Sequence, residues 1–177
     1  MSENKGAKSE VELLFMESGE AEQPFEWSIG KFGSRFLQEL RDNRRMIGSK
    51  CPKCGKVYLP PRKVCGDCYV AMKDIVPVSN EGEIVAASII RFGFIDPETG
   101  KQRPVPYGYI FVKPDGADTA ISHFMEIHSP EDEQYIRIGQ RVRAVYEEER
   151  SGSLLDIRCF EPVKWLPSDA EAADTPT

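Results

Sequence analysis

Four cysteines in two closely spaced pairs constrain this chain more than any other feature of its sequence. Cys51 and Cys54 form one Cys-x-x-Cys pair, Cys65 and Cys68 form another, and ten residues separate the two pairs. Each pair can make a tight turn that directs two thiolates at one point, and the glycine after the first pair suits such a turn. Because two turns of this kind supply four sulfur ligands in a tetrahedron, the sequence predicts a closed, structural zinc site at these four cysteines.

Other interpretations of the cysteines differ in what they require. Sulfur ligands alone do not exclude iron, so a rubredoxin-like electron carrier stays open. A thioredoxin-like redox site would need a single Cys-x-x-Cys at a strand-to-helix turn in a βαβ pattern, which the sequence does not offer. Four unrelated buried cysteines would not be expected at this spacing. Zinc is therefore the expected metal, with iron as the alternative.

The size and charge of the chain limit its class. The 177 residues, 40% of them hydrophobic, suit one ordinary domain or a small module attached to a domain of about 100 residues. We expect a cytoplasmic protein that is not in a membrane, because no apolar run approaches the roughly 20 residues of a membrane helix and the first residues contain no signal core. The formal net charge of −6 makes binding to a nucleic acid backbone less expected.

Residues 33–46 have a helical pattern, with Phe36 and Leu40 on one face. Ser34 is the expected N-cap, and Gly48 is expected to mark the C-terminal end. Arg41, Arg44 and Arg45 fall on the polar side and are candidates for contact with a partner, although a charged helix face is usually solvated.

After the cysteines, the hydrophobic period changes towards two. Five strands are predicted, at residues 82–94, 107–113, 119–127, 140–148 and 153–160. Five strands separated by Gly- and Pro-rich turns fit an OB-fold, a five-stranded Greek-key barrel. The expected fold is mainly β: a flexible acidic extension (1–25), an amphipathic helix (26–48), a zinc ribbon (49–72), an OB-fold barrel (73–166) and a disordered tail (167–177).

This combination resembles the family of OB-fold, acyl-CoA-associated proteins with a rubredoxin-like zinc ribbon. The resemblance runs from about Phe25 to Leu166, and its most specific stretch is CPKCGKVYLPPRKVCGDC. It implies a small, non-catalytic accessory subunit in a hetero-oligomer with a thiolase-fold large subunit. It further implies one structural zinc, and acyl-CoA or coenzyme A at the partner interface. Thiolysis of an aromatic 3-oxoacyl-CoA such as benzoylsuccinyl-CoA is one candidate reaction.

Three basic residues are candidates to bind coenzyme A or a carboxylate of the partner. Two prolines, which have a fixed φ angle and no N–H, precede Arg62 and would present it in a defined direction. Lys101 and Arg103 lie in a long loop before the second predicted barrel strand. A guanidinium can form paired hydrogen bonds with a carboxylate or a phosphate. Solvated side chains on a hairpin end and a mobile loop are the alternatives.

No catalytic arrangement is evident in the sequence. Alternation places Cys159 with Ile157 on the core side of the last predicted strand, where a thiol would be inert. His123 and His128 have an odd separation, so they would not share one face of a strand. We therefore expect no active site within this chain. A module that binds single-stranded nucleic acid remains the main alternative, since both zinc ribbons and OB barrels occur in such proteins, although no continuous basic and aromatic stripe is evident.

Overall fold

The structure is a computed structural model that describes residues 28–93, 95, 100 and 102–163. The predicted N-terminal extension, the predicted tail and Lys101 lie outside the described residues. The elements in chain order are α1 (Gly30–Asn43), β1 (Met46–Lys50), β2 (Val57–Tyr58), β3 (Asp74–Val78), β4 (Glu81–Ile90), β5 (Tyr107–Pro114), β6 (Ile121–Glu126), the 3-10 helix η1 (Pro130–Tyr135), β7 (Arg141–Tyr146), the 3-10 helix η2 (Leu154–Asp156) and β8 (Ile157–Pro162).

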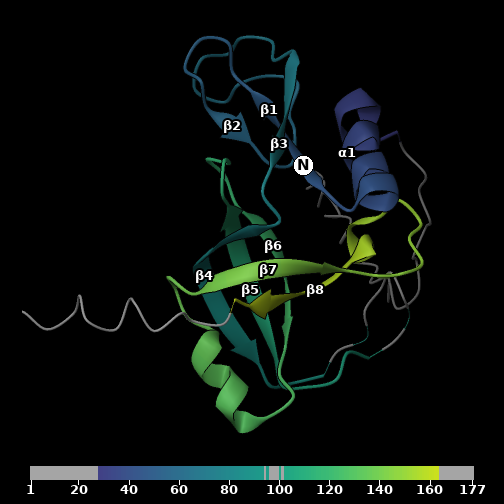
Figure 1. The fold of residues 1–177 in the computed structure, drawn as a ribbon, viewed down its shortest axis with the longest axis vertical. Helices are drawn as coiled ribbons and strands as arrows, with labels where there is room; N and C mark the ends of the chain where they lie inside the picture. The colour runs from purple at the N-terminus through teal and green to yellow at the C-terminus, as the bar shows by residue number, and fades with distance from the viewer. Residues whose placement is uncertain (1–27, 94, 96–99, 101, 164–177) are drawn as a thin grey trace, which may run out of the picture.

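The strands form two units that lie one above the other in Figure 1. The upper unit is a three-stranded antiparallel sheet in the order β2-β1-β3, which carries the cysteines. The lower unit is a closed barrel in the order β4-β5-β6-β8-β7, in which β7 pairs with β4 and the β6–β8 pair is parallel. The prediction of a zinc ribbon followed by a five-stranded OB-type barrel is therefore confirmed.

The position of the helix differs from the sequence prediction. It begins at Gly30 rather than at residue 33, and Ile29, not Ser34, is its N-cap residue. It ends at Asn43 because Arg44 adopts a left-handed conformation, with φ 50° and ψ 43°. Gly48 lies inside β1, so the predicted helical segment 26–48 contains a strand at its end. A Cβ at Gly48 would come within 2.7 Å of Val57 Cγ1, so close packing in the sheet explains this glycine.

Two predicted strands have different limits in the structure. β4 ends at Ile90, four residues before the predicted limit, and its register shifts between Ile84 and Ala86. β8 begins at Ile157 because the preceding residues form η2 instead, where the Ser153 side chain caps the helix. Hydrogen bonds at a cap outweigh the apolar pattern of residues 153–156.

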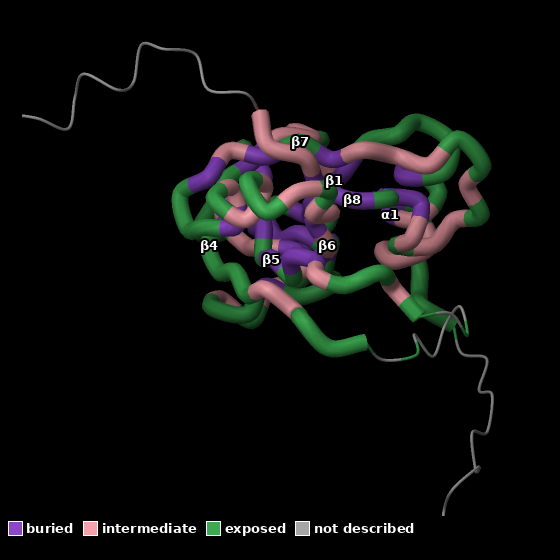
Figure 2. The backbone as a smooth tube through the Cα atoms, turned by 90° about the horizontal axis from the view of Figure 1, so that it is seen from below, coloured by how far each residue is buried: buried purple, intermediate pink, exposed green. Residues whose placement is uncertain are grey.

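One hydrophobic core joins the helix, the base of the ribbon and the barrel. Phe36 and Leu40 of α1 pack in the same buried cluster as Met46 of β1 and Ile84 of β4. From Gly108 to Pro114 of β5 the buried residues alternate with exposed ones, which leaves every second side chain on the outer surface of the barrel. Buried residues lie along the inside of the molecule, and exposed residues lie on the outer turns and loops (Figure 2).

Among the described residues, no helix is both long enough and apolar enough to cross a membrane.

Candidate metal centre

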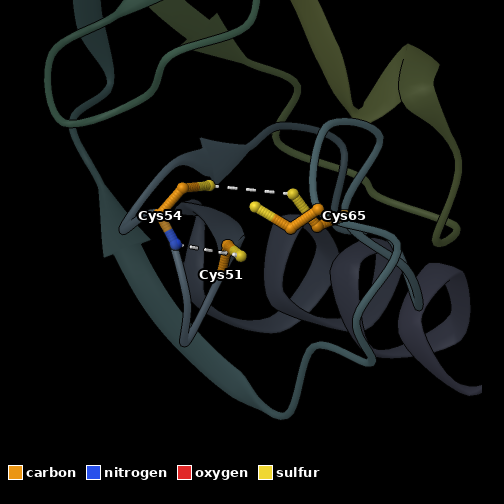
Figure 3. A group of neighbouring side chains, drawn as sticks. Cys51, Cys54 and Cys65 are labelled. Carbon is orange, nitrogen blue, oxygen red and sulfur yellow. Dashed lines mark hydrogen bonds between the residues drawn. The ribbon is translucent and has the colours of Figure 1, made fainter.

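The four cysteine sulfurs meet at the end of the ribbon. Cys51 directly follows β1, Cys54 precedes β2, and Cys65 and Cys68 lie in the segment between β2 and β3. All four sulfur atoms lie within 4.8 Å of one another, and the Cys54 and Cys65 sulfurs are 3.8 Å apart (Figure 3). This is a four-sulfur arrangement of the kind that holds a structural zinc ion.

The two cysteine pairs have equivalent patterns of backbone hydrogen bonds. In the first turn, the N–H of Gly55 donates to the Cys51 carbonyl at 3.0 Å, and the N–H of Cys51 donates to the Lys56 carbonyl at 2.8 Å. The N–H groups of Lys53 and Cys54 also point at the Cys51 sulfur, at 3.4 and 3.5 Å. N–H groups that face sulfur stabilise a thiolate, which is the form that binds a metal.

The second turn repeats this arrangement. The N–H of Tyr69 donates to the Cys65 carbonyl at 3.0 Å, and the N–H of Cys65 donates to the Val70 carbonyl at 3.0 Å. The Tyr58 hydroxyl lies 3.6 Å from the Cys65 sulfur. We call these two turns the first and second knuckle.

The surroundings give the thiols of Cys65 and Cys68 very different pKa values. Burial tends to raise the pKa of Cys65, but hydrogen bonds from the Tyr58 hydroxyl and from backbone N–H groups outweigh burial and lower it to about 6. Hydrogen bonding to Cys54, together with burial, raises the pKa of Cys68 to about 12. Four thiols this close cannot all ionise without a cation, and a bound zinc ion would supply the compensating charge.

The ribbon has little hydrophobic core of its own around this centre. The buried residues of that cluster are Cys51, Tyr58, Cys65 and Met72. Two of these four residues are candidate ligands, so a bound metal would contribute much of the energy that holds the knuckles together. With all four positions filled by sulfur, no coordination position is left for a substrate, and the site fits a structural role.

Arg62 is an exposed residue of the ribbon. Its backbone N–H donates to the Ser49 hydroxyl at 2.8 Å, and its guanidinium carbon lies 5.2 Å from the centre of the Tyr58 ring. Tyr58 in turn contacts Cys65. The ribbon therefore fixes Arg62 near the metal centre while leaving the guanidinium accessible.

Arg103 lies elsewhere, on the outer surface of the barrel. Its guanidinium carbon stacks 3.7 Å from the centre of the Phe124 ring and 5.8 Å from that of Tyr107. The ribbon meets the barrel at the other end of β6, through Thr119. The two predicted arginines are therefore not brought together.

A basic group that sequence reasoning missed lies between the helix and the ribbon. A pocket of about 320 Å³ separates α1 from β3 and has an apolar floor with three cationic side chains around it. None of the three cations forms an ion pair with another described residue. In the sequence, only the spacing of four residues between Lys31 and Arg35 indicates that two of these cations share one face of the helix. The pocket is lined by Lys31, Phe32, Arg35, Met72, Lys73 and Ile75.

The helix arginines singled out in the sequence are mostly engaged within the chain. Arg41 pairs with Asp42 at 2.8 Å, and Arg45 pairs with Glu39 at 2.6 Å. Arg44 is the C-cap residue of α1.

The remaining candidates for chemistry are dispersed. Cys159 is fully buried, and burial raises the pKa of its thiol. His123 is also buried, with its Nε2 3.3 Å from the Leu154 carbonyl oxygen, whereas His128 is exposed and lies 3.4 Å from Glu126. The core position predicted for Cys159 is confirmed, and this thiol has the environment of an unreactive one.

Comparison with known proteins identifies both parts of the chain. Residues 39–71 match the family described as the ChsH2 rubredoxin-like zinc ribbon domain, and residues 75–147 match the ChsH2 C-terminal OB-fold domain. Together the two matches cover more than half of the chain. A DUF35 domain-containing scaffold protein of Methanocaldococcus jannaschii is 24% identical over 113 residues, which are 63% of this chain and 74% of that protein.

Two solved structures share the fold. A DUF35-family protein of unknown function from Sulfolobus solfataricus has a TM-score of 0.50 and 22% identity, over 66% of this chain and 78% of that one. The structure described as an Ltp2-ChsH2(DUF35) aldolase has a TM-score of 0.52 and 18% identity, over 77% of this chain and 95% of that one.

Proposed function

Because the chain belongs to the ChsH2-type family, which joins a rubredoxin-like zinc ribbon to a C-terminal OB-fold domain, we propose that it is a non-catalytic accessory subunit of a thiolase-type acyl-CoA enzyme. The observation that carries this proposal is the presence of both ChsH2 domains in one chain, with four sulfurs gathered in a closed site. Its large partner subunit has a thiolase fold and performs the chemistry.

The surroundings of the nucleophilic groups support an accessory role. Thiolysis requires an activated nucleophile beside acid-base groups. Here the thiol outside the metal centre, Cys159, is buried with a raised pKa. One relative is called a scaffold protein, and one solved structure names ChsH2 together with Ltp2 in an aldolase. A chain that assists a second polypeptide fits both descriptions.

One zinc ion bound by Cys51, Cys54, Cys65 and Cys68 would make the ribbon rigid. Zinc in a four-sulfur site has no redox activity and no open coordination position. Its contribution would be to hold the two knuckles, and with them Arg62 on the neighbouring Tyr58 ring, in a fixed position for docking.

Coenzyme A would be bound where this chain meets its partner. Arg62, Lys101 and Arg103 were the residues proposed from the sequence, and the structure adds the pocket between α1 and β3. Its three cations, Lys31, Arg35 and Lys73, suit phosphate groups, and its apolar floor suits the uncharged part of an acyl-CoA. Reversing these charges should raise the KM for the acyl-CoA in the assembled enzyme. If only Arg103→Ala does so, the binding surface is on the barrel instead.

Thiolytic cleavage of an aromatic 3-oxoacyl-CoA such as benzoylsuccinyl-CoA is the reaction we propose for the complex. The decisive experiment is identification of the protein that co-purifies with this chain, followed by co-expression of the two and a thiolysis assay. The complex should cleave the thioester, whereas this chain alone should not. Full activity of the large subunit alone, with unchanged kinetics, would contradict an accessory role.

A second candidate function, binding to single-stranded nucleic acid, gains support from one observation. Tyr109, Phe111 and Phe124 form an aromatic strip on the outer surface of β5 and β6. The centre of the Tyr109 ring lies 5.8 Å from that of Phe111 and 5.8 Å from that of Phe124. Strands two and three of an OB barrel are the usual oligonucleotide surface, and bases stack on such rings. Salt-dependent binding of a labelled oligonucleotide, lost in Phe111→Ala, would favour this function over the accessory role.

A further inference from the structure

The two knuckles differ at one equivalent position. The residue directly after the second cysteine of each pair donates its N–H to the carbonyl of the first cysteine, and in both cases it has a positive φ angle. The first knuckle has Gly55 there, with φ +79°, and the second has Tyr69, with φ 55°. Glycine adopts this conformation freely, whereas a bulky residue does so only at a cost in free energy.

Tyr69 gains no packing in exchange for this strain. Its side chain is 84% exposed, more than any other large hydrophobic side chain among the described residues. A residue that is both strained and exposed contributes little to the folded chain itself. Backbone strain of this kind is concentrated at functional positions, because contacts made with another molecule can compensate for it.

The neighbours of Tyr69 extend the exposed apolar surface. Val64 and Ala71 pair across the base of the second knuckle, and both are exposed. We call Val64, Tyr69 and Ala71 the tip patch. Lys63 flanks this patch, is exposed and forms no ion pair with a described residue. The surface that fits the tip patch is therefore an apolar pocket with carboxylates at its rim.

The metal centre makes the tip patch suited to docking. Tyr69 follows the candidate ligand Cys68 directly, so a bound zinc would fix its backbone before any partner arrives. An aromatic side chain on a rigid support loses little conformational entropy on binding, and tyrosine is among the residues that dominate interface energetics. The hydroxyl group at the end of the ring can also find a hydrogen-bond partner in a pocket.

We propose that Tyr69 is the residue through which the ribbon docks on the large subunit, by inserting its ring into an apolar pocket with an acidic rim. This inference rests on the proposed accessory function and names the residue that would contact the large subunit. The left-handed backbone at Tyr69 directs the ring away from the ribbon and towards the partner.

The test measures binding of four purified variants to the thiolase-fold large subunit by calorimetry. Tyr69→Ala should weaken binding at least tenfold, because the ring is lost. Tyr69→Phe should bind within about threefold of the unmodified chain, since the ring remains. Ile138→Ala is the matched control, because Ile138 is 70% exposed but lies in the barrel before β7, and it should bind normally. Tyr69→Gly should lose binding, yet unfold at the same or a higher temperature, since it relieves the strain.

The zinc content and thermal unfolding of each variant establish that the ribbon is intact. If Tyr69→Ala binds as tightly as the unmodified chain, the inference is wrong while the accessory function stands. If the unmodified chain does not bind the large subunit at all, the proposed function itself is wrong. Two further outcomes also overturn the inference: concentration-dependent dimers that Tyr69→Ala abolishes, or direct binding of acyl-CoA that it abolishes. The first would mean that the ring contacts a second copy, and the second that it stacks on the ligand.

Discussion

Val57 of the ribbon and Asp118 of the barrel form two hydrogen bonds with each other. The N–H of Val57 donates to the Asp118 carboxylate at 2.8 Å, and the N–H of Asp118 donates to the Val57 carbonyl at 2.9 Å. The next pair repeats this contact, since the Thr119 hydroxyl accepts from the N–H of Leu59 and donates to its carbonyl, at 2.7 and 2.8 Å. The turn between β5 and β6 thus binds β2 and the residue after it, mostly through the side chains of Asp118 and Thr119, and it orients the ribbon on the barrel.

Removing the Thr119 hydroxyl should loosen the ribbon from the barrel. Thr119→Val preserves the shape but leaves the N–H and carbonyl of Leu59 without their partner, which should lower the free energy of unfolding by about 1–3 kcal/mol. Hydrogen exchange of the Leu59 N–H should accelerate most. Thr119→Ser keeps the hydroxyl and is the control. Unchanged exchange at Leu59 in Thr119→Val would show that the ribbon is held by other contacts.

Removal of the metal should unfold the ribbon and leave the barrel folded. The buried cluster around the metal centre contains two candidate ligands, whereas the larger apolar core that includes the barrel contains none. NMR spectra with excess chelator should lose the dispersed signals of residues 51–72 and keep those of β4 to β8. Metal analysis should find one zinc per colourless chain. A red protein with iron would instead identify an electron carrier, and complete unfolding would mean that the barrel depends on the ribbon.

The five cysteines should react with thiol reagents in two classes. Cys159 is fully buried, and burial raises the pKa of its thiol, so it should not react in the folded barrel. After removal of the metal, four thiols per chain should react quickly, and the fifth only in denaturant. Cys159→Ser should abolish the slow class alone. Five fast thiols without denaturant would show that the barrel opens when the metal leaves.

The part of the fold that the sequence predicted is the part set by local chemistry. The cysteine spacing determines the knuckles, and alternation determines the barrel strands, because both depend on a few neighbouring residues. The end of the helix was misplaced because Arg44, a residue without an obvious stop signal, adopts the left-handed conformation that glycine usually supplies. Lys73 joins Arg35 at a pocket because β3 lies beside α1, a tertiary relation that no spacing encodes.

Stability should fall on acidification partly because of His123. Burial lowers the pKa of this side chain, and the charge of Arg103 lowers it further. The Nδ1 atom has no hydrogen-bond partner among the described residues, so a proton there would be buried and unpaired. The unfolded chain binds a proton near pH 6.5, above the pKa of the folded state. The unfolded state therefore takes up protons first, and stability is lost as the pH falls below about 6.5.

Comparison with His123→Leu isolates this contribution. Between pH 8 and pH 5, the unmodified chain should lose more free energy of unfolding than the variant, by up to about 1.4 kcal/mol per pH unit. Urea unfolding at each pH measures the difference. Protonation of the metal ligands affects both proteins equally, so it cancels. Parallel pH profiles would show that His123 is protonated as readily in the folded chain as in the unfolded one.

Arg150 should hold the helix against the loop between β7 and β8. Its Nε donates to the carbonyl of Arg41 in the last turn of α1 at 2.6 Å, and its Nη1 donates to the carbonyls of Glu147 and Glu148, both at 2.7 Å. A cation at the C-terminal end of a helix also interacts favourably with the helix dipole. Arg150→Ala should therefore lower the free energy of unfolding by about 1–3 kcal/mol and speed hydrogen exchange in the last turn of α1. Arg150→Lys keeps the charge but cannot reach all three carbonyls, so it should recover only part of the loss. If Arg150→Ala leaves exchange in α1 unchanged, burial of Phe36 and Leu40 alone is sufficient to hold the helix.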